Sequence, residues 1–172
     1  MDVLIDEASI RARIQELGAT IRRDYGAGAP IHLVGVLKGA FMFLADLIRA
    51  IDGPVTCDFI AVSSYGARTK SSGEVRLMKD LDQTIEGRDV IIIEDIVDTG
   101  LTLQYLQDML LAREARSLKT ACLLSKPSRR KVDVVVEYIG FTIEDRFVVG
   151  YGLDFNEQSR NLPYIGVLDG AT

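Results

Sequence analysis

The sequence predicts a three-layer α/β domain, in which a mostly parallel central sheet carries helices on both faces. Short aliphatic runs alternate along the chain with amphipathic stretches of helical spacing. The aliphatic runs are apolar on both faces, which is typical of parallel strands that are buried between helices and joined by right-handed crossovers. A length of 172 residues fits one domain, so we expect residues 1–172 to fold as a single unit.

Apolar residues at spacings of three and four predict the helices. In the first helix, Ile10, Ile14, Leu17 and Ile21 form one stripe, and an acidic start suits the helix dipole. Helices are expected over residues 6–23, 40–51 and 101–113. Strands are expected over residues 31–37, 55–62, 89–93, 119–124, 132–139 and 146–149, with a further short strand over residues 165–168.

One polar stretch, residues 66–80, is too long for an ordinary connection between strands. It is rich in glycine, serine, lysine and arginine. It reads either as a flexible surface hairpin or as a lid that closes over a substrate.

Composition and charge exclude several classes of protein. With 48% apolar and 26% charged residues, the chain can fill a core. No aliphatic run reaches the about 18 residues of a membrane span, and Met1-Asp2 opens no basic leader, so we expect a soluble, cytoplasmic protein without a membrane partner. A net charge of −5 argues against nucleic-acid binding through a broad basic face.

The cysteines and the histidine offer little chemistry. Cys57 and Cys122 lie far apart with no histidine cluster near them, so we expect reduced strand residues rather than a disulfide or structural zinc. His32 is the only histidine, and a partly buried structural imidazole is expected there.

Polar residues follow four of the predicted strands. The segments are Leu37-Lys38-Gly39-Ala40, Ser63-Ser64-Tyr65-Gly66, the run from Glu94 to Thr102, and Ser125-Lys126-Pro127. Ligands bind beyond the carboxyl ends of open parallel sheets. The four segments at one edge therefore predict a binding site there.

The run VIIIEDIVDTGLT is the most informative of the four segments. Thr99, Gly100 and Thr102 open a helix, and their amides and hydroxyls suit an anion such as phosphate. Glu94 and Asp95 suit two neighbouring hydroxyls, as on a ribose ring. The pattern indicates a cradle for a ribose phosphate. A simple helix cap would explain Thr99 and Gly100 but not the three acids.

This run resembles the signature of the type I phosphoribosyltransferases, which use phosphoribosyl diphosphate. More narrowly, LKGAFMF, SSYG, LLSKP and RFVVGYGLDFNEQSRNLP resemble, in this order, segments of the hypoxanthine-guanine phosphoribosyltransferases. The resemblance extends from Leu37 to Pro163. It implies the fold of that family, with a mobile lid loop and a small C-terminal hood region, and transfer of phosphoribosyl to N9 of hypoxanthine or guanine in purine salvage, which releases diphosphate.

The resemblance also implies a role for each matching residue. Glu94 and Asp95 would hold the ribose hydroxyls, and Asp98, Thr99, Gly100, Leu101 and Thr102 would wrap the 5′-phosphate, with Asp98 also acting as acid or base at the purine N7. Lys38 and Gly39 would meet the diphosphate together with Arg160, in a loop that often has a cis peptide before the lysine. Ser64 and Tyr65 would belong to the lid. Lys126, Phe147 and the backbone of Val148 would bind the 6-oxopurine.

The resemblance implies Mg²⁺ as cofactor, with Asp154 and the pair Glu94 and Asp95 as its protein ligands, and a homodimer or homotetramer. Two residues depart from the pattern. Ala40 stands where many relatives have a second glycine, and Leu101 stands where some have lysine, so the phosphate loop must rely on amides and hydroxyls.

The proposed chemistry is also supported by the residues themselves. Loss of diphosphate from an anomeric carbon leaves a ribosyl cation and an anionic leaving group. Lys38, Arg160 and a Mg²⁺ near Asp154 supply cations for the leaving group, and the acids of residues 94–98 lie near the ring. A lid would exclude water from the activated sugar, which favours that interpretation of residues 66–80.

Simpler interpretations of single residues remain open. Lys126 could be an exposed strand-end lysine and Phe147 a core aromatic, and Asp154 and Arg160 could form a surface ion pair. A receiver domain is disfavoured because only one helix and one strand separate Asp95 from Lys126. No GxxxxGK[ST] or GxGxxG motif is present. A nucleic-acid-binding regulator of the same fold is disfavoured by the acidic charge.

Overall fold

The computed structural model describes residues 1–65 and 74–168. Its helices are α1 (Glu7–Tyr25), α2 (Phe41–Ala50) and α3 (Leu101–Leu111), with a short 3₁₀ turn at Pro127–Arg129. The strands are β1 (Asp2–Ile5), β2 (Ile31–Leu37), β3 (Val55–Tyr65), β4 (Glu74–Lys79), β5 (Asp89–Val97), β6 (Ser117–Ser125), β7 (Tyr138–Thr142), β8 (Val148–Val149) and β9 (Ile165–Val167).

The main sheet has six strands in the order β4-β3-β2-β5-β6-β7. All its pairings are parallel except that of β3 with β4 at one edge. This arrangement confirms the predicted mostly parallel sheet. It also places β5, with its acidic end, between β2 and β6.

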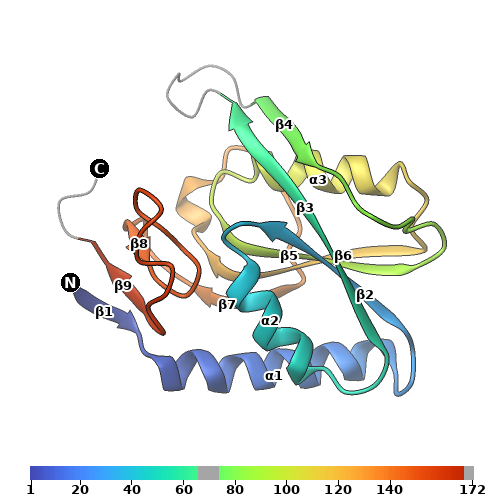
Figure 1. Cartoon of the computed structure of the whole chain (residues 1–172), viewed down its shortest axis with the longest axis horizontal. Coiled ribbons are helices and arrows are strands. Elements are labelled where there is room, and N and C mark those ends of the chain that lie inside the picture. Colours follow the sequence, from blue (N-terminus) through green and yellow to red (C-terminus); the bar gives the residue numbers. More distant parts are fainter. Residues whose placement is uncertain (66–73, 169–172) are drawn as a thin grey trace.

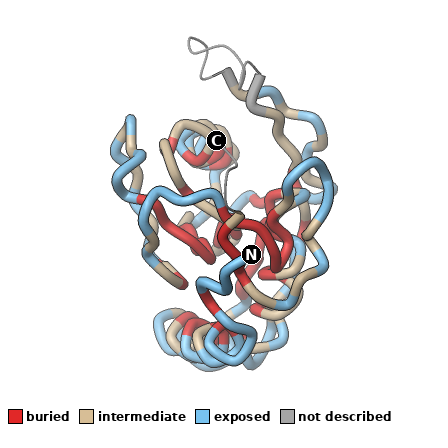
Figure 2. The backbone as a smooth tube through the Cα atoms, turned by 90° about the vertical axis from the view of Figure 1, so that its left-hand side faces the viewer, coloured by how far each residue is buried: buried red, intermediate tan, exposed pale blue. Residues whose placement is uncertain are grey.

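The side chains of the central strands alternate between two hydrophobic cores, and the helices pack on the sheet that these strands form (Figure 1). On β5, Ile91 and Ile93 face the core shared with α1 and α2, whereas Val90 and Ile92 face the core shared with α3. Strands whose two faces are both buried need apolar residues at every position. The three predicted layers are therefore present, and Figure 2 shows the buried residues gathered between exposed outer segments.

A second, smaller sheet forms a hood beside the carboxyl ends of the main strands (Figure 1). Its order is β1-β9-β8, and both pairings are antiparallel. The resemblance predicted a C-terminal hood. The structure adds the N-terminal strand β1 to it, which pairs with β9 across almost the full length of the chain.

The prediction of a strand over residues 132–139 is mostly wrong, because pairing with β6 begins only at Tyr138. The preceding backbone groups have other partners. The amides of Lys131 and Val132 donate to Thr99 O, and Val135 O accepts from Gln107. These contacts hold the segment against the start of α3 instead of in the sheet.

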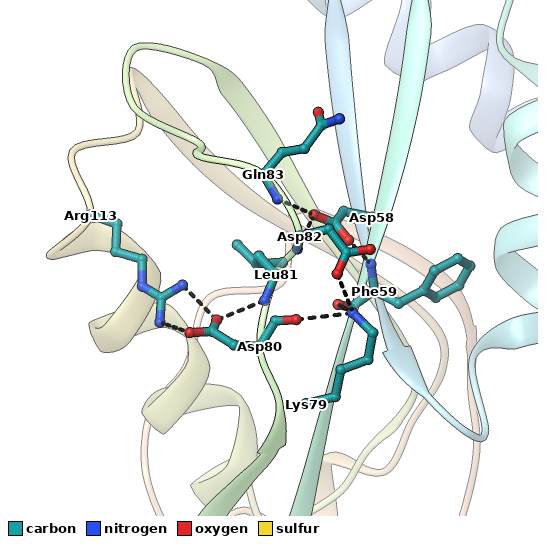
Figure 3. A network of polar contacts seen from close by, with 8 residues as sticks. All are labelled: Asp58, Phe59, Lys79, Asp80, Leu81, Asp82, Gln83 and Arg113. Atoms are coloured by element: carbon teal, nitrogen blue, oxygen red, sulfur yellow. Dashed lines mark hydrogen bonds and ion pairs between the residues drawn. The ribbon is translucent and has the colours of Figure 1, made fainter.

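The polar stretch that was predicted as a hairpin or a lid lies partly in strand β4, which pairs with a β3 that is longer than predicted. Residues 66–73 lie outside the described part of the chain. A polar network fixes the other end of β4 (Figure 3). Lys79 donates to Phe59 O at 3.0 Å, and Asp80 accepts two hydrogen bonds from Arg113, which follows the end of α3.

The buried carboxylate of Asp58 extends this network. It accepts from the amides of Asp82 and Gln83 at 2.9 and 3.1 Å, and from the amide of Phe59 at 2.7 Å. The connection from β4 to β5 is thereby bound to β3 through backbone amides. In residues 1–65 and 74–168, no helix is long and apolar enough to cross a membrane.

Candidate active site

A cavity of about 200 Å³ opens at the carboxyl ends of β2 and β5. Glu94, Asp95 and Asp98 line it together with Gly100 and Thr102 at the start of α3. The structure thus brings the predicted acids and the predicted phosphate-binding turn to one cavity. It lies at the sheet edge where parallel α/β folds bind ligands.

Glu94 is buried, and Asp95 and Asp98 are partly buried. Loss of hydration raises the pKa of Glu94 well above its usual value, and the nearby charges of Asp95 and Asp98 raise it further. Burial also raises the pKa of Asp95, to about 6, although hydrogen bonds to Asp95 Oδ from backbone amides and the positive charge of Arg160 oppose the rise. This clustered negative charge creates a demand for hydroxyl donors or a cation.

The turn into α3 presents backbone amides toward the cavity. Gly100 has φ of 86°, a left-handed conformation that favours glycine, and the first intrahelical bond runs from Gln104 N to Gly100 O. The amides of Thr102 and Leu103 therefore have no intrahelical acceptor. The Thr99 amide donates to Asp98 Oδ1 at 2.6 Å, which fixes the side chain of Asp98 at the rim.

Arg130 holds this turn from behind, and the sequence interpretation missed it. Its Nη1 donates to the carbonyls of Val97 and Asp98, each at 2.8 Å, and its Nη2 donates to Ser125 Oγ at 2.9 Å. One guanidinium therefore joins the end of β5 to the end of β6. No sequence motif marks it, because the signal is a set of carbonyls that only the fold brings together.

The loop after β2 lies against the acids. The peptide between Leu37 and Lys38 is cis, as the resemblance implied. A Cβ on Gly39 would overlap the Asp95 carboxylate, and a Cβ on Gly152 would lie 2.5 Å from Gly39 O. Glycine at position 39 therefore allows the loop after β2 to pack against Asp95. Glycine at position 152 allows the segment that follows β8 to pack against that loop.

Glu157, which was not predicted, links the two predicted cations. Its carboxylate accepts from Lys38 Nζ at 2.9 Å and from Arg160 Nη2 at 3.0 Å. Arg160 also lies 3.4 Å from Asp154 Oδ1, and its Nε is one of three buried side-chain atoms without a partner in the described part of the chain. Lys38, Asp154 and Arg160 therefore form one charged group beside the loop of Gly39.

Lys126 is buried, not an exposed strand-end lysine. Its Nζ lies 3.7 Å from Asp145 Oδ1, and Asp145 also contacts Arg129 at 3.4 Å. Arg129 Nε lies 3.9 Å from Asp98 Oδ2. Side chains of alternating charge thus connect Lys126 to Asp98. The sequence interpretation named Lys126 and Asp98 but neither of the residues between them.

Phe147 is partly exposed, so it is not a core aromatic. It stacks edge to face on Phe155 with ring centroids 5.6 Å apart. Val148 is buried in the hood, where it pairs with Val167. Ser64 and Tyr65 end β3 and pair with Val75 and Glu74 through their backbones.

The donor set fits a hard cation such as Mg²⁺. In the described ranges, no three potential metal-binding side chains cluster, so Glu94, Asp95 and Asp154 do not form a closed cage. Mg²⁺ commonly takes one or two carboxylates and fills its remaining positions with water and phosphate oxygens. Loss of hydration is the main cause of the raised pKa values of Glu94 and Asp95, and neighbouring acids raise them further, so a bound cation would stabilise both carboxylates in their charged form.

Comparisons with known proteins identify the family. Residues 4–156 match the model of the phosphoribosyl transferase domain. The chain belongs to the phosphoribosyltransferase family and is a transferase. Within that family its relatives are hypoxanthine-guanine phosphoribosyltransferases. The one from Bacillus subtilis (strain 168) is 54% identical over 166 residues, which cover 96% of this chain and 92% of that protein.

Other relatives and solved structures agree. The hypoxanthine phosphoribosyltransferase of Salmonella typhimurium is 50% identical over 96% of this chain and 94% of its own length. A crystal structure of a Bacillus anthracis hypoxanthine-guanine phosphoribosyltransferase superimposes with a TM-score of 0.93 at 49% identity and covers 98% of both chains. The likeness therefore extends over the main sheet and the hood.

Proposed function

We propose that the chain transfers the 5-phosphoribosyl group of phosphoribosyl diphosphate to N9 of hypoxanthine or guanine in purine salvage, and releases diphosphate. The observation that carries this proposal is the cavity that Glu94, Asp95 and the first turn of α3 share. Hydroxyl-binding acids and a phosphate-binding turn on one strand–helix unit suit a ribose 5-phosphate. The relatives at about half identity support the choice of base.

Glu94 and Asp95 accept hydrogen bonds from the ribose hydroxyls in this proposal. The amides and hydroxyls of Thr99, Gly100, Leu101 and Thr102 hold the 5′-phosphate, since the turn leaves amides without intrahelical acceptors. The carboxylates next to the anomeric carbon also stabilise the positive charge that develops there as diphosphate leaves.

Lys38, Gly39 and Arg160 bind the diphosphate. Lys38 and Arg160 already lie within hydrogen-bond distance of one carboxylate, Glu157, so their ammonium and guanidinium groups are close enough to share a second anion. The proximity of Gly39 to Asp95 supports a position of the leaving group beside the ring.

Lys126 donates to O6 of the purine, Phe147 stacks on the ring, and the backbone of Val148 contacts its edge. Asp98 takes or supplies the proton at N7. This assignment rests on the position of Asp98 at the cavity rim, where the Thr99 amide and Arg129 orient its carboxylate.

Glu94, Asp95 and Asp154 would hold Mg²⁺, directly or through water. When bound, the ion neutralises charge on the diphosphate and polarises the bond that breaks. The acids would bind hydroxyls and Lys38 would bind an anion through their own side chains. Both roles are therefore proposed independently of the metal ion.

The proposal includes a lid over the sugar, with Ser64, Tyr65 and the polar stretch of residues 66–80 as its candidates; residues 66–73 lie outside the described part of the chain. The resemblance and the polar composition support it. We further propose that residues 1–172 form one domain that assembles as a homodimer or homotetramer in the cytoplasm. A Trypanosoma cruzi relative of known structure has been studied for the role of its C-terminal region in its oligomeric state.

A spectrophotometric scan of purine bases with phosphoribosyl diphosphate, with and without Mg²⁺, tests the reaction. Hypoxanthine, guanine or both should be converted to the 5′-monophosphate only when the metal is present. Conversion of adenine alone, or no conversion of any purine, would contradict the proposal.

A further inference from the structure

A second cavity lies at the edge of the main sheet opposite the candidate active site. It has a volume of about 270 Å³, and its lining comes from the starts of β2 and β5 and the residue before β6; the residues are Pro30, Ile31, His32, Gly87, Arg88, Asp89 and Arg116. Asp89 and Glu94 lie five residues apart on β5, so about 16 Å separate this cavity from the acids. The catalytic proposal uses none of these residues.

His32 forms part of the lining and is 2% exposed. Its Nδ1 lies 2.7 Å from Thr56 Oγ1, and Arg88 Nη2 donates to the same oxygen at 2.9 Å. Because Thr56 Oγ1 already accepts from Arg88, its hydroxyl hydrogen is available for His32 Nδ1. When the hydroxyl donates that hydrogen to Nδ1, the neutral imidazole carries its own hydrogen on Nε2.

That Nε2 has no hydrogen-bond partner in the described part of the chain and is shielded from solvent. A buried N–H donor without an acceptor is uncommon, because it has lost its hydrogen bonds to water. Burial lowers the pKa of His32, and the positive charge of Arg88 lowers it further, which agrees with the neutral form. A ligand in this cavity therefore lies beside a neutral ring.

The charged residues of the cavity favour an anion. Asp89 is already compensated, because it accepts from Arg116 Nε at 3.1 Å and from Ser117 Oγ at 2.7 Å. Among the described residues, Arg116 uses only Nε and Nη2 in hydrogen bonds to Asp89, and Arg88 uses only Nη2 in its hydrogen bond to Thr56. A guanidinium has five N–H donors, so both arginines keep donors for oxygen atoms of a ligand.

We propose that this cavity binds a phosphate-class oxyanion through Arg88 and Arg116, beside the ring of His32. Its volume lies just below the about 300 to 1,000 Å³ of typical small-molecule sites, so it accommodates the anion with a small group attached. The two arginines and one aspartate leave a net positive charge. This site goes beyond the proposed transferase reaction and does not depend on it.

The single histidine makes the test specific. In protein labelled with ¹⁵N and ¹³C histidine, the imidazole resonances report on this cavity alone. Titration with inorganic phosphate at constant ionic strength should give a saturable shift of the Nε2 and Cε1 signals. The ¹⁵N shifts should also show the Nε2–H tautomer.

Arg88→Gln should weaken the phosphate affinity by about tenfold or more, the effect expected for loss of a charge-assisted hydrogen bond. The matched control Arg23→Gln removes the same charge from the exposed end of α1 and should keep the affinity. Thr102→Val at the candidate active site should keep it too, which separates this site from the 5′-phosphate turn.

A wild-type titration without a saturable shift would overturn the proposal. So would an equal shift with chloride, or equal affinity losses in Arg88→Gln and Arg23→Gln. Thermal unfolding of each variant checks folding, and the wild-type titration decides the question even if Arg88→Gln is unfolded.

Discussion

Asp98 keeps about half of its side chain exposed, whereas Glu94 is buried and Asp95 is partly buried. The three acids therefore meet different conditions although they lie within five positions of one another. Buried carboxylates suit groups that stay bound through the reaction, and an accessible carboxylate suits a proton that must be exchanged. We assign proton transfer to Asp98 on this difference.

Asp98→Asn should lower kcat by about 10²- to 10⁴-fold while KM changes little. An asparagine Oδ1 can still accept from the Thr99 amide, so the geometry of the turn survives while the proton acceptor is lost. Steady-state kinetics with hypoxanthine measure the effect. Asp133→Asn, at an exposed position, is the control; an unchanged kcat in Asp98→Asn would remove this residue from the mechanism.

Gly39→Ala should lower kcat/KM by about 10²-fold, because a Cβ there displaces the Asp95 carboxylate or the loop that binds diphosphate. Gly26→Ala is the matched control. Its φ of 91° strains an alanine, but no atom lies within 4 Å of the added Cβ, so stability should fall and KM should not change. Equal kinetic effects in both variants would show that general destabilisation, not the contact with Asp95, is responsible.

At the scale of elements, β2 was predicted without error, because its apolar residues face two cores. The helices differ from prediction by only one or two residues at most ends, since their apolar stripes are long. β1 was missed because it is short, mostly exposed and paired with a strand far along the chain. Pairing partners of this kind are set by tertiary structure, which local patterns do not contain.

The residues of the candidate site could likewise be predicted only where a local pattern carries them. Glu94, Asp95 and the start of α3 could be predicted because one continuous segment carries them. Arg130, Glu157 and Phe155 could not, because their partners come from other segments. A contact between distant loops leaves no periodicity in the sequence.

Arg130→Gln should lower kcat/KM by about 10- to 100-fold while the fold is retained. Arg130 fixes the turn that carries Asp98 to the strand end that carries Lys126, so its loss loosens two groups at once. Steady-state kinetics with circular dichroism measure both properties. Arg146→Gln, which changes an exposed arginine in a nearby loop, should behave as wild type; wild-type kinetics in Arg130→Gln would exclude a positioning role.

At the scale of the whole molecule, the buried acids oppose folding at neutral pH. A carboxyl whose folded pKa is raised above its unfolded value stabilises the fold below the unfolded pKa, and that stability is lost as pH rises through the folded pKa. For Asp95 the window runs from 3.8 to about 6. The acids that the site needs therefore lower the stability of the ligand-free protein at neutral pH.

Asp95→Asn should accordingly raise the free energy of unfolding of the ligand-free protein at pH 8 by about 1 to 3 kcal/mol. The gain should vanish below pH 4, where the wild-type carboxyl is protonated. Urea unfolding at both pH values measures it, with Asp52→Asn at an exposed position as control. The same variant should bind phosphoribosyl diphosphate more weakly; a loss of stability at pH 8 would contradict the assigned burial effect.

The hood joins β1 and β9, the first and last strands of the described residues, and β1 has no other strand partner there. During synthesis on the ribosome, β1 emerges before every strand of the main sheet, and its partner β9 emerges after all of them. The main sheet can pair while the nascent chain still grows, but the hood cannot. We therefore expect the hood to be the last part of this domain to form.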